Sequence, residues 1–154
     1  MRFLVVAVGQ RMPAWVDAGF AQYAGRMPRE ARVELLVVKA AARGGPLQPA
    51  IEAEGKRILA ALPARSLRVV LDERGVLLST MDVVRRIARW RQAGRDVAFI
   101  VGGADGLAES VRKSADLLWS LSPLTLPHGL ARVMLAEQLY RAISILHNHP
   151  YHRD

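Results

Sequence analysis

Five short apolar runs, separated by segments with helical periodicity, constrain the fold of this 154-residue chain more than any other feature. The runs cover residues 2–8, 33–38, 67–71, 97–101 and 117–121. Their length and their content of Val, Leu and Ile predict buried β-strands. Helical patterns cover residues 13–27, 49–62, 79–91, 107–115 and 130–146. Strands that alternate with helices predict an α/β fold, with a mostly parallel sheet and helices on both of its faces.

The composition indicates one soluble domain, which we expect to span residues 1–154. Hydrophobic residues make up 51% of the chain and charged residues 23%, which argues against extended disorder. The absence of cysteine excludes disulfides, thiolate zinc sites and cysteine nucleophiles. No apolar run approaches the roughly 18 residues of a membrane span, and the first run is too short for a signal peptide. We therefore expect a cytoplasmic protein.

The charge balance is strongly basic and points to a polyanionic partner. The chain has 22 Lys and Arg against 14 Asp and Glu, a net charge of +8, and nearly all of the basic residues are arginine. A net positive field favours nucleic acid as the partner. The alternative is an arginine-rich proteome, in which arginine replaces lysine on ordinary solvated surfaces.

Local signals place the turns and the start of one helix. We expect a turn at residues 72–75 (Asp-Glu-Arg-Gly), directly after the third strand. Ser79 and Asp82 have the spacing of a capping box at the start of the next helix. Gly and Pro at positions 44–46 predict a flexible, basic loop over residues 39–48.

The last helical segment, residues 130–146, is apolar over most of its circumference. Its few polar residues include Arg132, which lies opposite the others on a helical wheel. A helix of this kind needs more cover than one sheet face provides, so we expect a homodimer. The alternative is a helix buried within one subunit. Glu137 and Arg141 have the i,i+4 spacing of a helix ion pair, although an arginine aimed at a substrate is also compatible with it.

Two loops that follow strands are candidate ligand-binding segments. Gly102 and Gly103, with Gly106 close behind, allow the backbone to approach a ligand, but they form neither a dinucleotide nor a P-loop motif. Residues 121–126 (LSPLTL) offer backbone amides and carbonyls beside leucine side chains, which suits an adenine ring. A tight strand-to-helix turn and an ordinary packed connection are the respective alternatives. The carboxyl ends of parallel strands are where open α/β sheets bind ligands.

The chain ends in a polar and aromatic tail, residues 147–154 (HNHPYHRD). The spacing of His147, His149 and His152 across a proline does not match known zinc ligand sets, so we expect no metal. The mixture of imidazole, aromatic ring and guanidinium suits stacking on a base and contact with phosphate. A frayed terminus is the alternative.

Four segments of the sequence resemble the ribosomal RNA large subunit methyltransferase H family. They are GGADGL, WSLSPLTLPHGLARVMLAEQLYRA, the terminal NHPYHRD and the N-terminal FLVVAVGQRMPAWVDAGFAQYAGRMP, and the resemblance covers essentially the whole chain. It implies a homodimeric SPOUT-class α/β fold with a C-terminal trefoil knot. It also implies that S-adenosyl-L-methionine is used to methylate N3 of a pseudouridine in helix 69 of 23S rRNA, on the assembled ribosome.

The resemblance also implies the functional residues. The implied cofactor-binding residues are Leu71, Gly102, Gly103, Leu121, Ser122, Pro123, Leu124, Thr125 and Leu126. A small residue such as alanine would be expected at Pro123, which places the local backbone geometry in question. The tail residues Tyr151, His152 and Arg153 are implied on the substrate side, where they complete the pocket of the partner subunit.

The proposed chemistry requires removal of the imide proton from N3. Our hypothesis is that His152 or a bound water accepts or relays this proton, while Arg153 stabilises the developing anion. Arg85, Arg86, Arg89 and the loop around Arg43 are candidate rRNA contacts. Two other functions fit the sequence: a non-catalytic RNA-binding or ribosome-assembly module, and an α/β enzyme that uses another nucleotide on a small substrate.

Overall fold

The structure is a computed structural model that describes residues 1–9, 12–103 and 105–152. The strands are β1 (Phe3–Gly9), β2 (Val33–Lys39), β3 (Leu67–Leu77), β4 (Val97–Val101) and β5 (Leu117–Ser120). The helices are α1 (Ala14–Ala24), α2 (Leu47–Ala61), α3 (Thr80–Gln92), α4 (Glu109–Lys113) and α5 (His128–Leu146), with a short 3-10 helix at Arg29–Ala31. The predicted strands and helices are thus confirmed, with shifts of a few residues at their ends.

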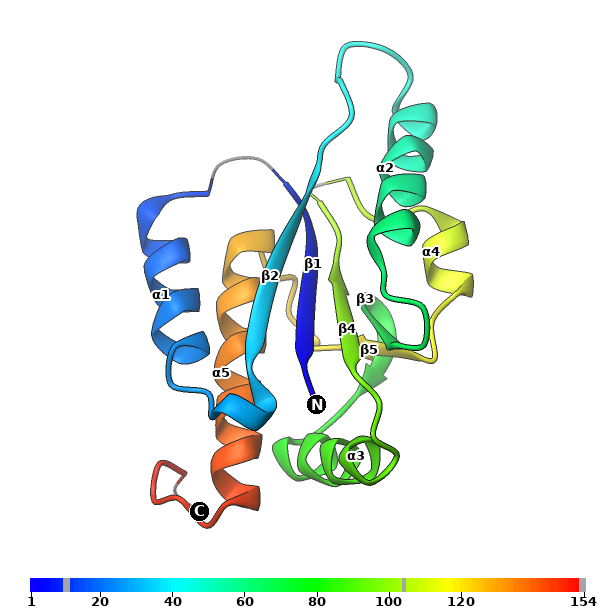
Figure 1. Cartoon of the computed structure of the whole chain (residues 1–154). Helices are drawn as coiled ribbons and strands as arrows, with labels where there is room; N and C mark the ends of the chain where they lie inside the picture. The colour runs from blue at the N-terminus through cyan, green and yellow to red at the C-terminus, as the bar shows by residue number, and fades with distance from the viewer. Residues whose placement is uncertain (10–11, 104, 153–154) are drawn as a thin grey trace.

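The five strands form one parallel sheet in the order β2-β1-β4-β3-β5. Phe3 at the start of β1 is in register with Val33 on one side and Val97 on the other. The carboxyl ends of the strands therefore meet at one edge of the sheet, and those of β1, β2 and β4 point to the top of Figure 1. This arrangement confirms the predicted parallel sheet.

Helices cover both faces of the sheet, and each face has its own core. On one face Phe3, Phe99 and Trp119 pack beneath α1, α3 and α5. On the other face Ile100 and other central-strand residues pack beneath α2 and α4. All five residues of β4 are buried, as expected for a strand enclosed on both faces.

The predicted turn at residues 72–75 is wrong, because β3 continues through this segment to Leu77. Leu71 and Val76 both pair with Trp119 of β5, so the four residues between them form a bulge. The pairing then resumes between Leu77 and Ser120. Asp, Glu and Gly favour turns locally, but pairing with β5 keeps the chain extended beyond the bulge. The bulge turns the polar side chains of this segment towards the carboxyl edge of the sheet.

The start of α3 confirms the predicted capping box. The Ser79 hydroxyl accepts a hydrogen bond from the Asp82 amide at 3.1 Å, and the Asp82 carboxylate accepts one from the Ser79 amide at 2.9 Å. These bonds satisfy backbone donors that the first turn of a helix leaves free. The apolar stripe of α3 packs against the core, which fixes the helix on the sheet.

Helix α5 packs along its length against the sheet, α1 and α3. Its residues are buried or half-buried, and Arg132 is only 2% exposed. The homodimer stays a prediction, and so does the trefoil knot. Within the described part of the chain, no helix has the length and apolarity needed to span a membrane.

Helix α5 ends in a turn that folds the tail back onto the helix. Asn148 has a left-handed φ of 55°, its amide donates to the Ile145 carbonyl at 3.1 Å, and the His149 amide donates to the Ser144 carbonyl at 2.8 Å. These two bonds and the left-handed residue form a Schellman motif, which asparagine tolerates better than most residues. The tail through His152 is therefore a folded element, and the alternative of a frayed terminus does not describe it.

Candidate functional site

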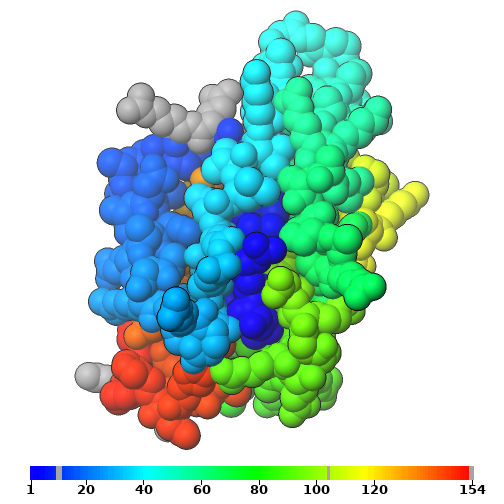
Figure 2. All heavy atoms as spheres, viewed as in Figure 1, coloured from blue at the N-terminus to red at the C-terminus, as the bar shows by residue number. Residues whose placement is uncertain are grey.

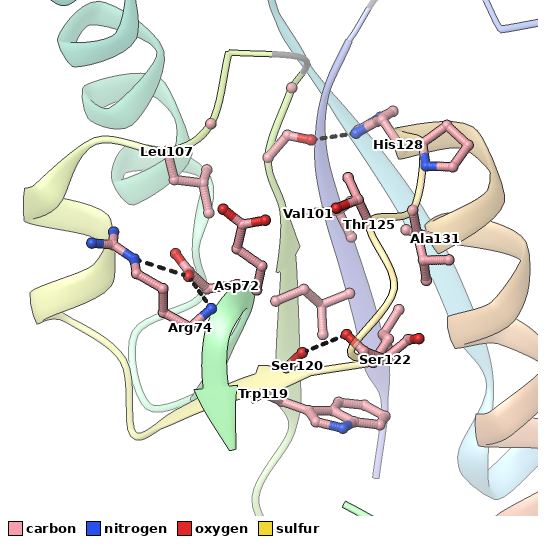
Figure 3. Close-up of a pocket in the computed structure, with 18 of the residues that line it drawn as sticks. Asp72, Arg74, Val101, Leu107, Trp119, Ser120, Ser122, Thr125, His128 and Ala131 are labelled. Carbon is pink, nitrogen blue, oxygen red and sulfur yellow. Dashed lines mark hydrogen bonds and ion pairs between the residues drawn. The ribbon is translucent and has the colours of Figure 1, made fainter. Parts of the chain in front are cut away.

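A cleft of about 910 Å³ lies at the carboxyl edge of the sheet. Its lining comes from four places: the end of β3 and its bulge, the glycine loop after β4, the segment from β5 into α5, and single residues of α2 and α4. Figure 3 shows these side chains converging on the cleft from both sides of β4. The volume matches that of a site for a small organic ligand.

The structure brings almost all the predicted cofactor residues together at this cleft. Eight of the nine line it: Leu71, Gly102, Gly103, Leu121, Ser122, Leu124, Thr125 and Leu126. Pro123 is exposed and does not contribute to the lining. Segments that are about 30 and 20 residues apart in sequence therefore form one continuous surface, because parallel strands place their carboxyl ends side by side.

The glycine loop after β4 is shaped by close packing that only glycine permits. A Cβ atom at Gly102 would lie 2.7 Å from the Cγ atom of Leu107, whose side chain lines the same cleft. Gly106 has a φ of +88°, and its amide donates to the Gly103 carbonyl at 3.1 Å. These features leave the backbone of the loop as part of the cleft wall.

The segment after β5 is held in shape by its serines. The Ser120 hydroxyl donates to the Ser122 carbonyl at 3.0 Å, and the Ser122 hydroxyl accepts from the Leu124 amide at 2.9 Å (Figure 3). Leu124 is the most exposed large apolar side chain of this surface, at 74%. A leucine that projects from the rim of a cleft is available to cover an apolar ligand group.

Sequence reasoning missed an ion pair in the cleft wall. Asp72, in the β3 bulge, accepts a hydrogen bond from Arg112 Nε of α4 at 2.6 Å and one from the Arg74 amide at 2.8 Å. The Asp72 side chain is 6% exposed. Burial alone would raise the pKa of Asp72, but the Arg74 amide and the Arg112 guanidinium hold it below the usual value. The cleft therefore carries a stable carboxylate paired with a cation.

A second missed feature is a relay of hydrogen bonds at the start of α5. Arg132 Nε donates to His128 Nε2 at 2.9 Å, and His128 Nδ1 is bonded to the Gly102 carbonyl (Figure 3). Burial, followed by the charge of Arg132, lowers the pKa of His128, although the bond to Gly102 opposes this. Burial also lowers the pKa of Arg132, against the attraction of Asp17. The i,i+4 spacing of His128 and Arg132 was the one sequence signal for this contact.

The predicted substrate residues lie at the opposite end of α5 from the cleft. This helix has 19 residues and is about 28 Å long, with His128 at one end and the tail at the other (Figure 1). Tyr151 and His152 are described there, whereas Arg153 lies outside the described residues. A single chain therefore does not bring the tail to the cleft.

The tail is packed against the C-terminal half of α5 by aromatic and charged groups. Tyr151 donates a hydrogen bond to Glu137 Oε1 at 3.1 Å, and its ring centroid lies 4.6 Å from that of Tyr140. Arg141 Nη2 is 2.6 Å from the same Glu137 oxygen, which confirms the helix ion pair. Burial and the bond to Glu137 raise the pKa of Tyr151 to about 12. Among the described residues, His152 Nδ1 is buried and has no hydrogen-bond partner.

The candidate RNA-contact arginines differ in how free their guanidinium groups are. Arg43 belongs to the segment after β2, which projects beyond the rest of the molecule in Figure 2. Its guanidinium group pairs with Glu54 and Asp105 at 3.1 Å each, so two carboxylates compete with any RNA phosphate for it. Arg85 pairs with Asp82 on α3, and Arg89 is exposed on the same helix. Among residues 1–9, 12–103 and 105–152, no group of three or more His, Asp or Glu residues could hold a metal ion.

Comparison with known families gives a match over nearly the whole chain. The profile of a family described as "Predicted SPOUT methyltransferase" matches residues 1–152. Two curated relatives carry the name ribosomal RNA large subunit methyltransferase H. The protein of Nitrosospira multiformis is 53% identical over 155 residues, covering 99% of both chains. That of Thioalkalivibrio sulfidiphilus is 51% identical over 156 residues, covering both chains completely.

Solved structures show a similar fold at low sequence identity. A probable methylase family protein from Haemophilus influenzae Rd KW20 has a TM-score of 0.55 and 11% identity, over 99% of this chain and 70% of that one. A putative methylase family protein from Neisseria gonorrhoeae has a TM-score of 0.58 and 14% identity, over 90% of this chain and 81% of that one. At these identities the likeness extends to the fold alone.

Proposed function

This chain belongs to the SPOUT methyltransferases, within the ribosomal RNA large subunit methyltransferase H family, and from this premise we propose its substrate and cofactor. The proposed reaction is methyl transfer from S-adenosyl-L-methionine to N3 of a pseudouridine in helix 69 of 23S rRNA, on the assembled ribosome. The proposed active form is a homodimer of chains with a C-terminal trefoil knot. The observation that carries the proposal is the single cleft formed by the two strand-end loops.

The cleft fits S-adenosyl-L-methionine in size and in chemistry. A volume of about 910 Å³ accommodates a nucleoside with an amino-acid side chain. Its leucine walls suit the adenine ring, and the backbone of Gly102 and of residues 121–126 offers hydrogen-bonding groups to the edge of that ring. Asp72 supplies a carboxylate within the same cleft, a group that accepts hydrogen bonds from ribose hydroxyls. The residues present therefore suit this cofactor.

When bound, S-adenosyl-L-methionine supplies a methyl group on a positively charged sulfur, which a nucleophile can take directly. The contribution of the chain is to hold both reactants in line and to keep water away, which supplies much of the rate. N3 of the base must also lose its imide proton. We propose that His152 accepts or relays this proton, since its Nδ1 has no hydrogen-bond partner among the described residues.

Two neighbouring tail residues have different assignments in this scheme. The Tyr151 hydroxyl cannot act as the base near neutral pH, because its pKa is raised to about 12. Its ring is held by Tyr140 and by Arg141, whose Cζ lies 5.1 Å from the ring centroid, so it supports the position of the tail. Arg153 remains assigned to the developing anion on the base, as the resemblance implies.

The distance between cleft and tail requires a second chain in the proposed site. Because α5 separates them by about 28 Å within one chain, the tail can serve a cleft only in a partner subunit. An antiparallel pair of chains would place each tail at the cleft of the other. The length of α5 is thus a second argument for a homodimer, independent of the apolar surface of this helix.

Helix α3 is the proposed contact surface for rRNA. It carries Arg85, Arg86 and Arg89, and it lies at the same end of the molecule as the tail (Figure 1). Arg91 Nη2 lies 2.7 Å from His147 Nε2, which joins this helix to the start of the tail. Phosphate contacts and the substrate-side residues would then share one face.

The direct test is transfer of labelled methyl from S-adenosyl-L-methionine to ribosomes that lack the modification, with free 23S rRNA in parallel. We expect label on ribosomes and little on free RNA. His152→Ala should lower transfer by about 10²- to 10⁴-fold, while His149→Ala, in the exposed part of the tail, should leave it near the wild-type level. Turnover of His152→Ala that is unchanged across pH would remove His152 as the base. No label on either RNA, despite binding of S-adenosylhomocysteine, would favour the non-catalytic RNA-binding module.

The rRNA surface has a separate test in the salt dependence of ribosome binding. Each true phosphate contact on α3 should reduce the slope of log K against log salt by about 1 when it is replaced by alanine. Lys56→Ala is a matched control, because Lys56 is exposed on α2 on the other face of the sheet. Equal slopes for Arg89→Ala, Lys56→Ala and wild type would show that Arg89 contacts water and not rRNA phosphate.

A further inference from the structure

We propose that His128 and Arg132 are positioning residues for cofactor binding, which act by holding the Gly102–Gly103 peptide in one orientation at the cleft. The inference rests on the proposed S-adenosyl-L-methionine site. It concerns residues that the resemblance did not supply and that sequence reasoning missed. His128 lines the cleft, whereas Arg132 lies behind it and reaches the cleft only through His128.

The direction of the hydrogen bonds follows from the donors and acceptors available. Arginine has only donors, so His128 Nε2 must accept the bond from Arg132 Nε. A neutral imidazole that accepts at Nε2 carries its proton on Nδ1, and this proton is donated to the Gly102 carbonyl. Arg132 thereby selects the tautomer of His128 that can bind the glycine loop. The chain of bonds has one direction, from α5 to the end of β4.

Arg132 is itself fixed by its surroundings. The side chain is 2% exposed and lies against the end of β1, where a Cβ on Gly9 would come within 2.5 Å of Arg132 Nη2. Glycine at this position therefore leaves room for the guanidinium group. Close packing leaves a side chain buried in this way little room to move, so the relay starts from a confined group between β1 and α5.

The recipient of the relay is the peptide between two glycines, which have no side chains of their own to restrict it. Two successive glycines have the widest conformational freedom of any dipeptide, and this freedom is lost when a ligand orders them. In a planar trans peptide the carbonyl and the amide point in opposite directions. Fixing the Gly102 carbonyl towards His128 therefore also fixes the direction of the Gly103 amide. Both residues line the cleft, so their ordering before binding lowers the entropic cost of holding the cofactor.

The relay also accounts for a histidine that is kept neutral. Protonation of Nε2 would set a positive charge directly against the Arg132 guanidinium and break the bond between them. The desolvation of His128 and the charge of Arg132 both oppose this, and they lower the pKa of the imidazole. The lowered pKa therefore favours the neutral imidazole, whose Nε2 can accept the bond from Arg132.

Two amide substitutions separate the two halves of the relay. The amide nitrogen of asparagine occupies the place of Nδ1, so His128→Asn keeps a donor for the Gly102 carbonyl. The amide of glutamine occupies the place of Nε2, so His128→Gln keeps a partner for Arg132 and loses the bond to Gly102. The two variants thus lose one bond each, and His128→Asn loses the one that pairs the buried Arg132 guanidinium, so it should be the less stable of the two. The probe is S-adenosylhomocysteine, with its Kd measured by calorimetry and the unfolding midpoint of each variant measured in urea.

We expect His128→Asn to bind the probe within about threefold of wild type although it is the less stable variant, and His128→Gln to bind it about tenfold more weakly although it keeps the partner of Arg132. Arg132→Lys, which keeps the charge but lacks the Nε donor, should also lose about tenfold. Equal weakening of the asparagine and glutamine variants would overturn the inference, because it would reduce His128 to a packing role. Wild-type affinity in His128→Gln would overturn it as well. Failure of the wild-type protein to bind the probe would instead overturn the proposed function, and the inference would fall with it.

Discussion

Gly75 is the position where adding a single methyl group should disturb both the fold and the cleft. It lies in the β3 bulge, directly against the backbone of β5. A Cβ atom at this residue would lie 2.6 Å from the carbonyl carbon of Leu118, 2.6 Å from the amide nitrogen of Trp119 and 2.7 Å from the Leu118 carbonyl oxygen. These neighbours are backbone atoms, so no side-chain rotation can relieve the contact. Gly75→Ala must therefore move one strand away from the other.

The cost follows from the size of this movement. Normal carbon contacts are 3.5–4.0 Å, so β5 has to shift by about 1 Å. Such a shift weakens the pairing of Val76 with Trp119 and of Leu77 with Ser120. Two backbone hydrogen bonds at about 1 kcal/mol each, with overpacking strain of about 1–2 kcal/mol, give a loss of about 3–4 kcal/mol in the free energy of unfolding.

The assay is urea unfolding of Gly75→Ala beside Gly45→Ala. Gly45 has nothing within 4 Å of an added Cβ, so the control should change the free energy of unfolding by less than about 0.5 kcal/mol. Because Trp119 lines the cleft, Gly75→Ala should also weaken binding of S-adenosylhomocysteine. A Gly75→Ala protein as stable as Gly45→Ala would refute the argument, since it would mean that β3 and β5 do not approach as closely as described.

Two further predictions concern stability. The pKa of His128 is lower in the folded chain than the value of about 6.5 in the unfolded one, so the unfolded state binds more protons between these two values. Its contribution to stability is therefore complete above about pH 6.5 and is lost as the pH falls towards the folded pKa. Urea unfolding at a series of pH values should show a shallower acid loss for His128→Asn than for wild type, and parallel curves would contradict the assignment. Ser79→Ala removes the capping box of α3 and should cost about 1 kcal/mol in urea unfolding, whereas Ser79→Thr should retain most of it. Equal losses in these two variants would show that the hydroxyl does not cap the helix.

The order of strands and helices could be predicted from sequence because each element has its own periodic signal. The capping box at Ser79 and the buried run of β4 are signals of this local kind, and both are confirmed. The bulge at residues 72–75 could not be predicted, because the residues are typical of turns. What keeps them extended is pairing with β5, more than 40 residues further along the chain.

Sequence reasoning predicted the loops of the candidate site but missed the charged residues that pack around them. Glycines and the LSPLTL segment differ visibly from ordinary strand ends, and the rule that ligands bind at carboxyl edges predicted that they would meet. Asp72, Arg112 and Arg132 carry no such signal, since charged residues are common on any surface. Arg132 in particular was noted only for its place on the helical wheel, because a sequence does not reveal that the end of β1 will enclose it. The tail was also predicted as part of the site. Because α5 separates the tail from the cleft of its own chain, this prediction can be tested only in a dimer.

The strand order also decides when this protein can fold during its synthesis. The interior strand β1 is made first, yet its partner β4 begins only at Val97, and β3 pairs with β5 only from Leu117. Most sheet contacts therefore join distant parts of the chain, which is typical of slow folding. Until β4 emerges, β1 can pair only with β2, and its other edge remains open. The sheet is completed, and covered by α5, only when nearly all of the chain has left the ribosome.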